Sequence, residues 1–495
     1  MEGEEPLLQE NTERASMAEE AAAALLPPPE AGRKAFLEEM KEVSHIALPM
    51  IVVTMSQYLQ RTSPLLMLGH LGELPLSSAS IATSLCSVTG YSILFGMSSA
   101  LETLCGQAYG AGQHRKLGAF TYAAILCLLL VCIPVSILWL LAGKLLRLIG
   151  QDPSVAAEAG KYAIWLIPTL FPYAILQSLV RYLQTQRLTL PLMWTSGTAL
   201  GVQLTICWVF IFKLNLGSAG AALSIAISYS FNMILILLYV KYSSTCKKTH
   251  AALALSRELY STIGEFFRFA VPSAVMACME WWSFELVVLL SGILPNPKLE
   301  TSVLAICFTT TSVHCQIPYS FAAAASVRVS NALGAGKPQA AIVALSTVLI
   351  LLATEAFLAS IAIFCCRYVW GYVFTSEQEV ITYLKDITPL LCLSIIFDGI
   401  QIVLSGVARG TGWQHIGAYV NLGSYYLVGI PVALLLGFVL HLKGEGLWSG
   451  LVVGAFVQSI ALSLITAFTN WEKRTVEARQ RMFNEQMLPQ DGFLE

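Results

Sequence analysis

The sequence predicts an all-α membrane protein with twelve transmembrane helices in two six-helix bundles related as parallel repeats. Three observations predict this class. Hydrophobic residues make up 56% of the 495 residues and charged residues only 12%, and the mean hydropathy is +0.67. Apolar segments long enough to cross a bilayer as helices recur along the chain. The second six of these segments repeat the first six at a nearly constant offset.

The predicted spans are runs of about 20 or more largely apolar residues, the length that a helix needs to cross a bilayer. They cover residues 45–68, 76–101, 117–141, 160–181, 189–212, 217–240, 265–292, 301–325, 339–364, 384–407, 414–438 and 445–468. Many contain Gly, Pro, Ser or Thr, which helices packed in lipid tolerate. The alternating pattern of a transmembrane strand is absent, which argues against a barrel.

These spans divide the chain into two lobes and three polar segments. We expect a disordered cytoplasmic tail at 1–35, an N-lobe at 36–240, a cytoplasmic linker at 241–264, a C-lobe at 265–470 and a cytoplasmic tail at 471–495. The acidic first segment lacks the basic start and apolar core of a signal peptide. Lys and Arg are more frequent in the loops after even-numbered spans, which predicts that these loops face the cytoplasm.

The internal repeat is clearest in a glycine-containing segment. An offset of 224 residues places AYGAG at 108–112 on ALGAG at 332–336, and Gln177 on Gln401. Because each half has an even number of spans, the halves run parallel, about an axis along the membrane normal. Three pairs of repeat-related positions carry further predictions. We expect gating turns at Gly110, Gly112, Gly334 and Gly336, and helix kinks at Pro49 and Pro272.

Acidic residues inside the predicted spans are the main candidates for a functional site. A charge at the bilayer centre costs about 2.5–3.5 kcal/mol on insertion scales, so it is rarely kept without a role. The intramembrane acids are Glu280 and Glu285 in span 7, Glu355 in span 9 and Asp398 in span 10. All four belong to the second half, whereas Gln57 and Ala174 occupy the positions that correspond to Glu280 and Asp398. The pattern predicts proton handling in the C-lobe.

Glu280 and Asp398 are the preferred proton-coupling and substrate residues. At helical spacing Asp398 shares a face with Ser394, Gln401 and Ser405, and Glu280 shares one with small and hydroxyl side chains. Glu285 lies about 140° around the helix from Glu280, which predicts that the two cannot both point at one cavity centre. A proton and a cationic substrate that compete for such carboxylates would suffice for an antiporter.

Other polar and aromatic residues are secondary candidates. They are Glu285, Glu355, Gln57, Thr310, His314, Gln401, Trp281 and Tyr425. His314 can titrate near neutral pH, and the aromatic rings can contact a cation. Each also has an ordinary interpretation, because most polar and aromatic side chains in membrane helices only pack or form hydrogen bonds.

Several classes of function lack their sequence signals. The twelve Cys have no metal or disulfide spacing, so we expect no metal site. No Walker motif is present, so we expect no ATP and no other cofactor, with a proton gradient as the energy source. Basic stripes with interleaved aromatics are absent, so we expect no nucleic-acid partner.

Four segments together resemble a known family. They are ALETLCGQAYGAG at 100–112, YLQTQ at 182–186, MEWWSFE at 279–285 and LSGVARGTGWQ at 404–414. The chain resembles the plant-type multidrug and toxic compound extrusion (MATE) transporters, the DETOXIFICATION family. The resemblance implies two bundles forming a V and the export of organic, often cationic, metabolites or xenobiotics in exchange for protons. It also implies that acids of spans 7 and 10, here Glu280 and Asp398, carry the coupling.

The chain departs from the family pattern at two places. Animal relatives have a glutamate in span 8, where this chain offers Thr, His and Gln, and some prokaryotic relatives have an aspartate in span 1, where it has Gln57. Two alternatives stay open: a lipid-linked sugar flippase of the same superfamily, and a membrane-embedded enzyme. We expect no enzyme, because the His residues are isolated. We further expect a monomer in the plasma or vacuolar membrane, with protons, a small organic substrate and the bilayer as its partners.

Overall fold

The computed structural model describes residues 29–249 and 257–483, and helices make up nearly all of this part of the chain. The N-lobe contains α2 (Pro29–Leu68), α3 (Glu73–Cys86), α4 (Ser92–Ser98), α5 (Ala100–Gly110), α6 (His114–Leu140), α7 (Ala142–Leu148), α8 (Pro153–Thr185), α9 (Thr189–Trp208) and α10 (Gly217–Tyr242). The C-lobe contains α11 (Arg257–Ser291), α12 (Pro297–Gly334), α13 (Pro338–Cys366), α14 (Gln378–Thr411), α15 (Gln414–Asn421), α16 (Ile430–Leu434) and α17 (Lys443–Ala467). A last helix, α18 (Trp471–Phe483), follows it.

The helices account for the predicted spans. Within the described ranges, ten helical segments are long and apolar enough to cross a membrane. The helices α2 and α12, with 40 and 38 residues, are more polar and contain the predicted spans 45–68 and 301–325. The prediction of an all-α membrane fold is confirmed.

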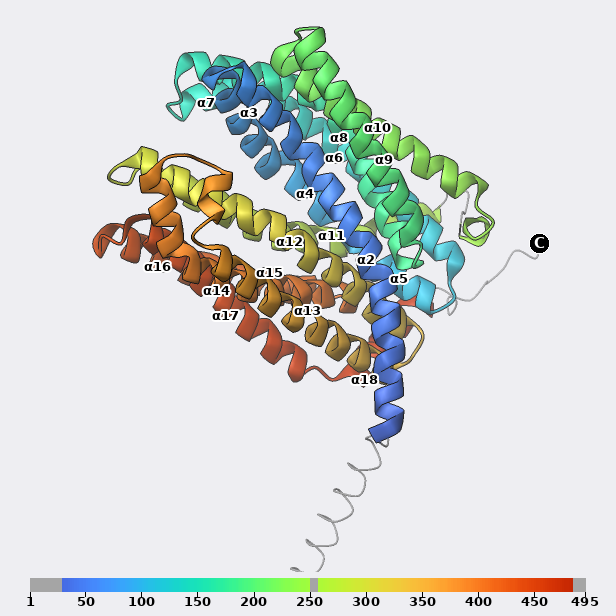
Figure 1. Cartoon of the computed structure of the whole chain (residues 1–495). Helices are drawn as coiled ribbons and strands as arrows, with labels where there is room; N and C mark the ends of the chain where they lie inside the picture. The colour runs from blue at the N-terminus through green and yellow to red at the C-terminus, as the bar shows by residue number, and fades with distance from the viewer. Residues whose placement is uncertain (1–28, 250–256, 484–495) are drawn as a thin grey trace, which may run out of the picture.

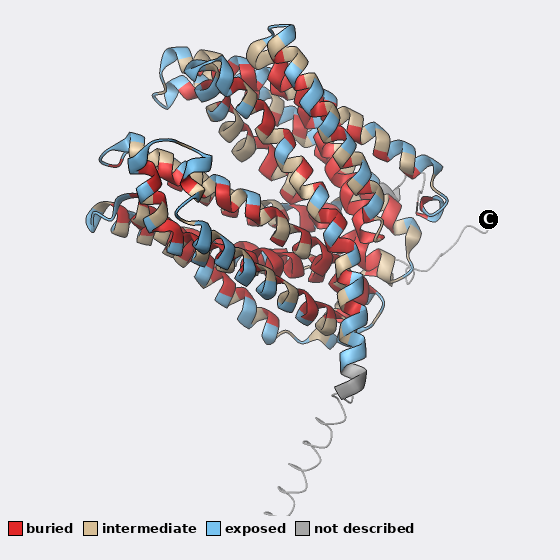
Figure 2. Cartoon of the chain, viewed as in Figure 1, coloured by how far each residue is buried: buried red, intermediate tan, exposed pale blue. Residues whose placement is uncertain are grey.

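The two lobes meet at one end and diverge at the other (Figure 1). Between lobes, α12 packs against α2 and α5, and α11 packs against α4. Within lobes, α8 packs against α6 and α10, and α14 packs against α12 and α17. Figure 2 shows the buried residues gathered where the lobes converge, with exposed residues on the outer faces.

The outer face of α6 shows how the chain meets lipid. Leu126, Leu130, Ile133 and Ile137 are 43–58% exposed. Their spacing of three and four residues places them on one side of the helix. In a soluble protein such an apolar stripe would have to be covered, whereas lipid tails accept it directly.

Helical structure extends into the predicted polar segments. Residues 1–28, 250–256 and 484–495 lie outside the described residues, and so does most of the predicted disordered tail. α2 begins at Pro29 and α11 at Arg257, both earlier than the predicted lobe limits. Near the start of α2, Glu39 pairs with Arg328 of α12 through two contacts of 2.6 Å. This bidentate pair holds the beginning of α2 against the other lobe.

The segment after the last span is also helical, although its polar composition predicts a loose tail. α18 is amphipathic, and it buries Ala478 and Met482, which are one turn apart. Ala478 packs against Val329 and Leu333 of α12. Burial of one apolar side therefore stabilises a helix that the mean polarity of the segment does not predict.

Candidate functional site: a cavity between the lobes

A cavity of about 410 Å³ lies between the two lobes. The N-lobe lines it with residues of α2 and α3, and the C-lobe lines it with residues of α11, α12 and α14. Glu280, Glu285 and Asp398 are all in its wall. Because these carboxyl groups border one cavity, they can act on one bound molecule.

Hydrogen bonds, rather than cations, hold the two preferred carboxyl groups. Gln401 Nε2 and Tyr319 Oη each donate to Glu280 Oε1 over 3.3 Å, and Ser394 Oγ donates to Asp398 Oδ2 over 2.7 Å. Neither carboxylate forms an ion pair with a cation of residues 29–249 or 257–483. Since no adjacent cation fixes their charge, both groups are suited to exchange a proton or a cation.

Glu285 also lies in the wall of this cavity. It accepts a hydrogen bond from Ser84 of the N-lobe, and it lines the same cavity as Glu280. The angle of about 140° between the two residues therefore keeps neither of them out of the cavity wall. The cavity extends along α11 from Glu280 to Val288 and reaches α3, so side chains from a wide arc of the helix border it.

The secondary candidates separate into two groups. Trp281 and Gln401 line the interlobe cavity. Glu355 and His314 form a hydrogen bond with 3.0 Å between Oε1 and Nε2. Thr310 accepts a hydrogen bond from Trp370 Nε1 over 3.1 Å. Glu355, His314 and Thr310 are not among the lining residues, and their contacts with each other or with Trp370 are those of packed polar groups.

Gln57 and Tyr425 also lie outside this cavity. Gln57 borders a smaller space of about 90 Å³ that residues of both lobes line, and it accepts from Gln177 Nε2 over 3.5 Å. Tyr425 is fully buried and packs against Phe284, with ring centroids 6.3 Å apart. A direct cation contact for Tyr425 is therefore not open in this conformation, whereas Trp281 lines the cavity, with Phe95 stacked on its ring.

A buried ion cluster closes the end at which the lobes meet. Glu102 of α5 pairs with Arg409 of α14 at 2.9 Å and with Arg181 of α8 at 3.7 Å. Gln107 Nε2 donates to the carbonyl of Gly410 over 3.2 Å. Sequence patterns did not reveal this cluster, because its partners are as much as 307 residues apart.

The glycine turns lie at this same lobe contact. A Cβ atom on Gly110 would be 2.1 Å from the carbonyl oxygen of Asn331, and one on Gly334 would be 2.2 Å from that of Gln107. The two contacts are related by the repeat offset. Gly112 and Gly336 follow with φ of +73° and +78°, which favours glycine. The turns therefore permit the backbones of the two lobes to touch.

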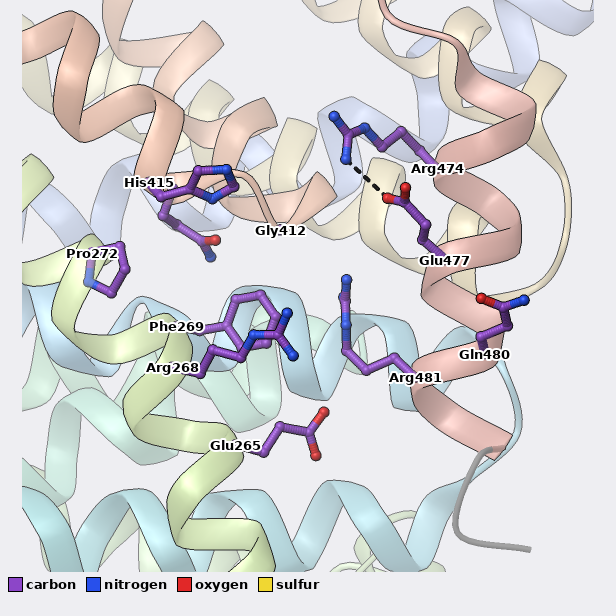
Figure 3. A pocket seen from close by; sticks show the side chains of 11 residues that line it. Glu265, Arg268, Phe269, Pro272, Gly412, His415, Arg474, Glu477, Gln480 and Arg481 are labelled. Atoms are coloured by element: carbon purple, nitrogen blue, oxygen red, sulfur yellow. Dashed lines mark hydrogen bonds and ion pairs between the residues drawn. The ribbon is translucent and has the colours of Figure 1, made fainter. Parts of the chain in front are cut away.

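A second, polar cavity of about 730 Å³ lies beside α18 (Figure 3). Charged side chains of α11 and α18 line it, among them Arg268, Arg474, Glu477 and Arg481. Arg481 Nη1 donates to Gln107 Oε1 over 2.5 Å, and burial lowers the pKa of Arg481. The two cavities share no lining residue. Through Arg481, α18 reinforces the closed end.

Two helical bundles with a cavity between them, bordered by carboxyl groups, form an architecture found in many membrane transporters. The MatE family model matches residues 49–209 and 272–435, and the chain belongs to the MatE family. It is 52% identical over 451 residues to Protein DETOXIFICATION 14 of Arabidopsis thaliana, covering 91% of this chain and 93% of that protein. Protein DETOXIFICATION 12 of the same plant is 49% identical over 447 residues, with 90% and 92% covered.

A solved structure agrees with this assignment. The crystal structure of the eukaryotic MATE transporter AtDTX14 superposes with a TM-score of 0.87 and 54% identity, over 90% of this chain and 100% of that one. The resemblance seen in the sequence is therefore confirmed. The protein is a multi-pass membrane transporter for small molecules, and it is not an enzyme.

Proposed function

We propose that the protein exports organic, often cationic, compounds from the cytosol in exchange for protons. The observation that carries this proposal is the position of Glu280 and Asp398 in one interlobe cavity without an ion-pair partner. A carboxylate can hold either a proton or a cationic group, and the two ligands compete for the same charge. Such competition couples the movement of one to the movement of the other.

The closed end determines the order of steps that we propose. In this conformation the Glu102 cluster and the glycine contacts close the end that the loop charges predict to be cytoplasmic. Protons from the opposite, acidic side would bind Asp398 and Glu280 and neutralise them, so a bound cation leaves. The lobes would then close on that side and separate at the cytoplasmic end. Release of the protons to the cytosol would restore the charged site for new substrate.

The same proposal covers the energy source, the oligomeric state and the membrane in which the protein works. The proton gradient supplies the driving force, and no ATP or other cofactor takes part. The protein works as a monomer, in the plasma membrane or in the vacuolar membrane. Both settings provide an acidic compartment opposite the cytosol, so the same cycle serves either.

The test is transport by purified protein in proteoliposomes with an imposed pH gradient. We expect uptake of a fluorescent organic cation to follow the gradient and to fall at least about tenfold in Asp398→Asn, because loss of one coupling group removes the ionic contact. Glu355→Gln is the matched control, since Glu355 is an intramembrane acid outside the cavity, and it should keep most of the activity. Undiminished gradient-driven uptake by Asp398→Asn would contradict the proposal.

A further inference from the structure

Arg61 introduces a positive charge into a cavity whose other charged groups are acids. It lies on α2, in the N-lobe wall of the interlobe cavity. The other polar N-lobe side chains in this wall carry hydroxyl groups: Tyr58, Thr62, Ser80, Thr83, Ser84 and Ser87. The C-lobe wall opposite carries Glu280, Glu285 and Asp398. The cavity is therefore bipolar, with one cationic side and one anionic side.

Arg61 differs from the arginines at the lobe contact, because it has no carboxylate partner. Arg181, Arg328 and Arg409 each lie within 4.0 Å of a glutamate oxygen, whereas no such contact of Arg61 exists in the described part of the chain. Its guanidinium lies 5.8 Å from the ring centroid of Trp281. Four tyrosines, Tyr58, Tyr91, Tyr173 and Tyr229, are near enough to interact with its charge. A half-buried guanidinium ordinarily pairs with an oxyanion, whereas Arg61 borders the cavity without such a partner among the described residues.

We propose that Arg61 binds an anionic oxygen group of the substrate, so that the preferred substrates are zwitterionic aromatic compounds. The inference rests on the proposed transport function and specifies its substrate class. A substrate amine would lie toward the acids of the C-lobe, its carboxylate toward Arg61, and its ring beside Trp281 and Phe284. A simple anion would be repelled by three carboxylates, and a simple cation would leave Arg61 unpaired. A zwitterion satisfies both sides.

The structure also offers a rival role for Arg61. The contact with Trp281 joins an N-lobe residue to a C-lobe residue, so Arg61 could serve only to hold the lobes together. A purely structural role would affect all ligands alike. A binding role would affect only ligands that carry an anionic group, and this difference separates the two.

The experiment compares two forms of one rhodamine dye, the free acid, which is zwitterionic, and its methyl ester, which is a cation. Binding to the purified full-length protein in lipid nanodiscs is followed by fluorescence anisotropy, without a pH gradient. We expect the wild type to bind the free acid at least about tenfold more tightly, as for one charge-assisted contact. Arg61→Gln should remove this preference and leave ester binding within about twofold. Arg61→Lys, which keeps the charge, should retain part of the preference.

Thr62→Val is the matched control, since it changes a neutral residue of the same wall and should not alter the ratio of the two affinities. Equal binding of both dyes by the wild type, binding of neither, or equal weakening of both by Arg61→Gln would overturn the inference. Gradient-driven uptake of the ester dye in proteoliposomes tests the antiport proposal separately. Loss of coupling there, with the dye preference intact, would leave the role of Arg61 standing.

Discussion

The two lobes have the same frame and different chemistry. Gln177 of the N-lobe and Gln401 of the C-lobe are equivalent in the repeat, and each donates a hydrogen bond to the equivalent residue of its lobe. The acceptor is Gln57 in the N-lobe, at 3.5 Å, and Glu280 in the C-lobe, at 3.3 Å. Where the C-lobe has Asp398, the N-lobe has Ala174. One substituted acceptor thus turns a neutral amide pair into a site that can hold charge.

The lobes are most alike where they touch. Gly110 lies against Asn331 and Gly334 against Gln107, at matching distances, and Asn331 donates to the Thr185 carbonyl as Gln107 donates to that of Gly410. The contact is formed by both copies of the turn. Each copy has a glycine at the closest approach and an amide side chain, Gln107 or Asn331, that donates to a carbonyl group. The cavity needs charge on one side only. The two repeated lobes can therefore be alike at the glycine contact and differ in charge at the interlobe cavity.

The largest effect on stability is expected for Glu102→Gln, which breaks an ionic cluster that joins the two lobes and whose carboxylate comes from the N-lobe. The change leaves Arg181 and Arg409 buried without their carboxylate, and removing one partner of a buried pair costs about 3–5 kcal/mol. Thermal unfolding in detergent should show a clear loss of stability. Glu158→Gln, which removes an exposed pair with Lys161, is the control and should change little.

The symmetric contact can be broken at one glycine. Gly334→Val places side-chain atoms on the Gln107 carbonyl, and overpacking of this kind costs about 1–3 kcal/mol. The end at which the lobes meet should close less completely, which labelling of Cys introduced near the Glu102 cluster would detect as faster reaction. Gly201→Val should have no such effect, since a Cβ atom there meets nothing within 4 Å. Unchanged labelling in Gly334→Val would show that the turn does not control closure.

Moving the carboxyl group of Asp398 to the equivalent position of the N-lobe tests whether the two lobes are interchangeable there. Ala174→Asp, added to Asp398→Asn, should restore no gradient-driven transport, because Ala174 is fully buried and does not line the cavity. An unsatisfied carboxyl group in this place should also destabilise the protein by about 1–3 kcal/mol. Recovery of transport in the double variant would mean that the lobes are interchangeable at this position.

A further acid of the C-lobe, Glu300, should affect folding without affecting coupling. Glu300 Oε2 accepts from Tyr383 Oη over 2.9 Å and from the amide of Gly444 over 3.0 Å. Glu300→Gln should reduce stability by about 1 kcal/mol, as expected for weakened hydrogen bonds to a charged group. The ratio of protons to substrate, measured in proteoliposomes, should stay at the wild-type value. A changed ratio would remove the distinction between cavity acids and structural acids.

The sequence predicts the frame of this molecule better than its contacts. The spans, the offset of 224 and the cavity acids Glu280 and Asp398 follow from hydropathy and from the cost of charge in a bilayer. The Glu102 cluster does not, since it depends on three helices that are far apart in the chain. The helix angle alone does not show that Glu285 also lines this cavity, because the angle does not give the width of a cavity. The sequence around Arg61 does not indicate a binding role. That role is suggested only by the structure, which places Arg61 in the same cavity as the acids of the C-lobe.

The most direct test of the central claim is the release of protons when substrate binds. Purified protein in weakly buffered detergent solution, with a pH indicator, receives an organic cation that does not itself titrate. The account predicts proton release on binding by the wild type, and little release by the double variant Glu280→Gln, Asp398→Asn. Equal release by both proteins, or tight binding with no release by the wild type, would contradict exchange at these carboxyl groups.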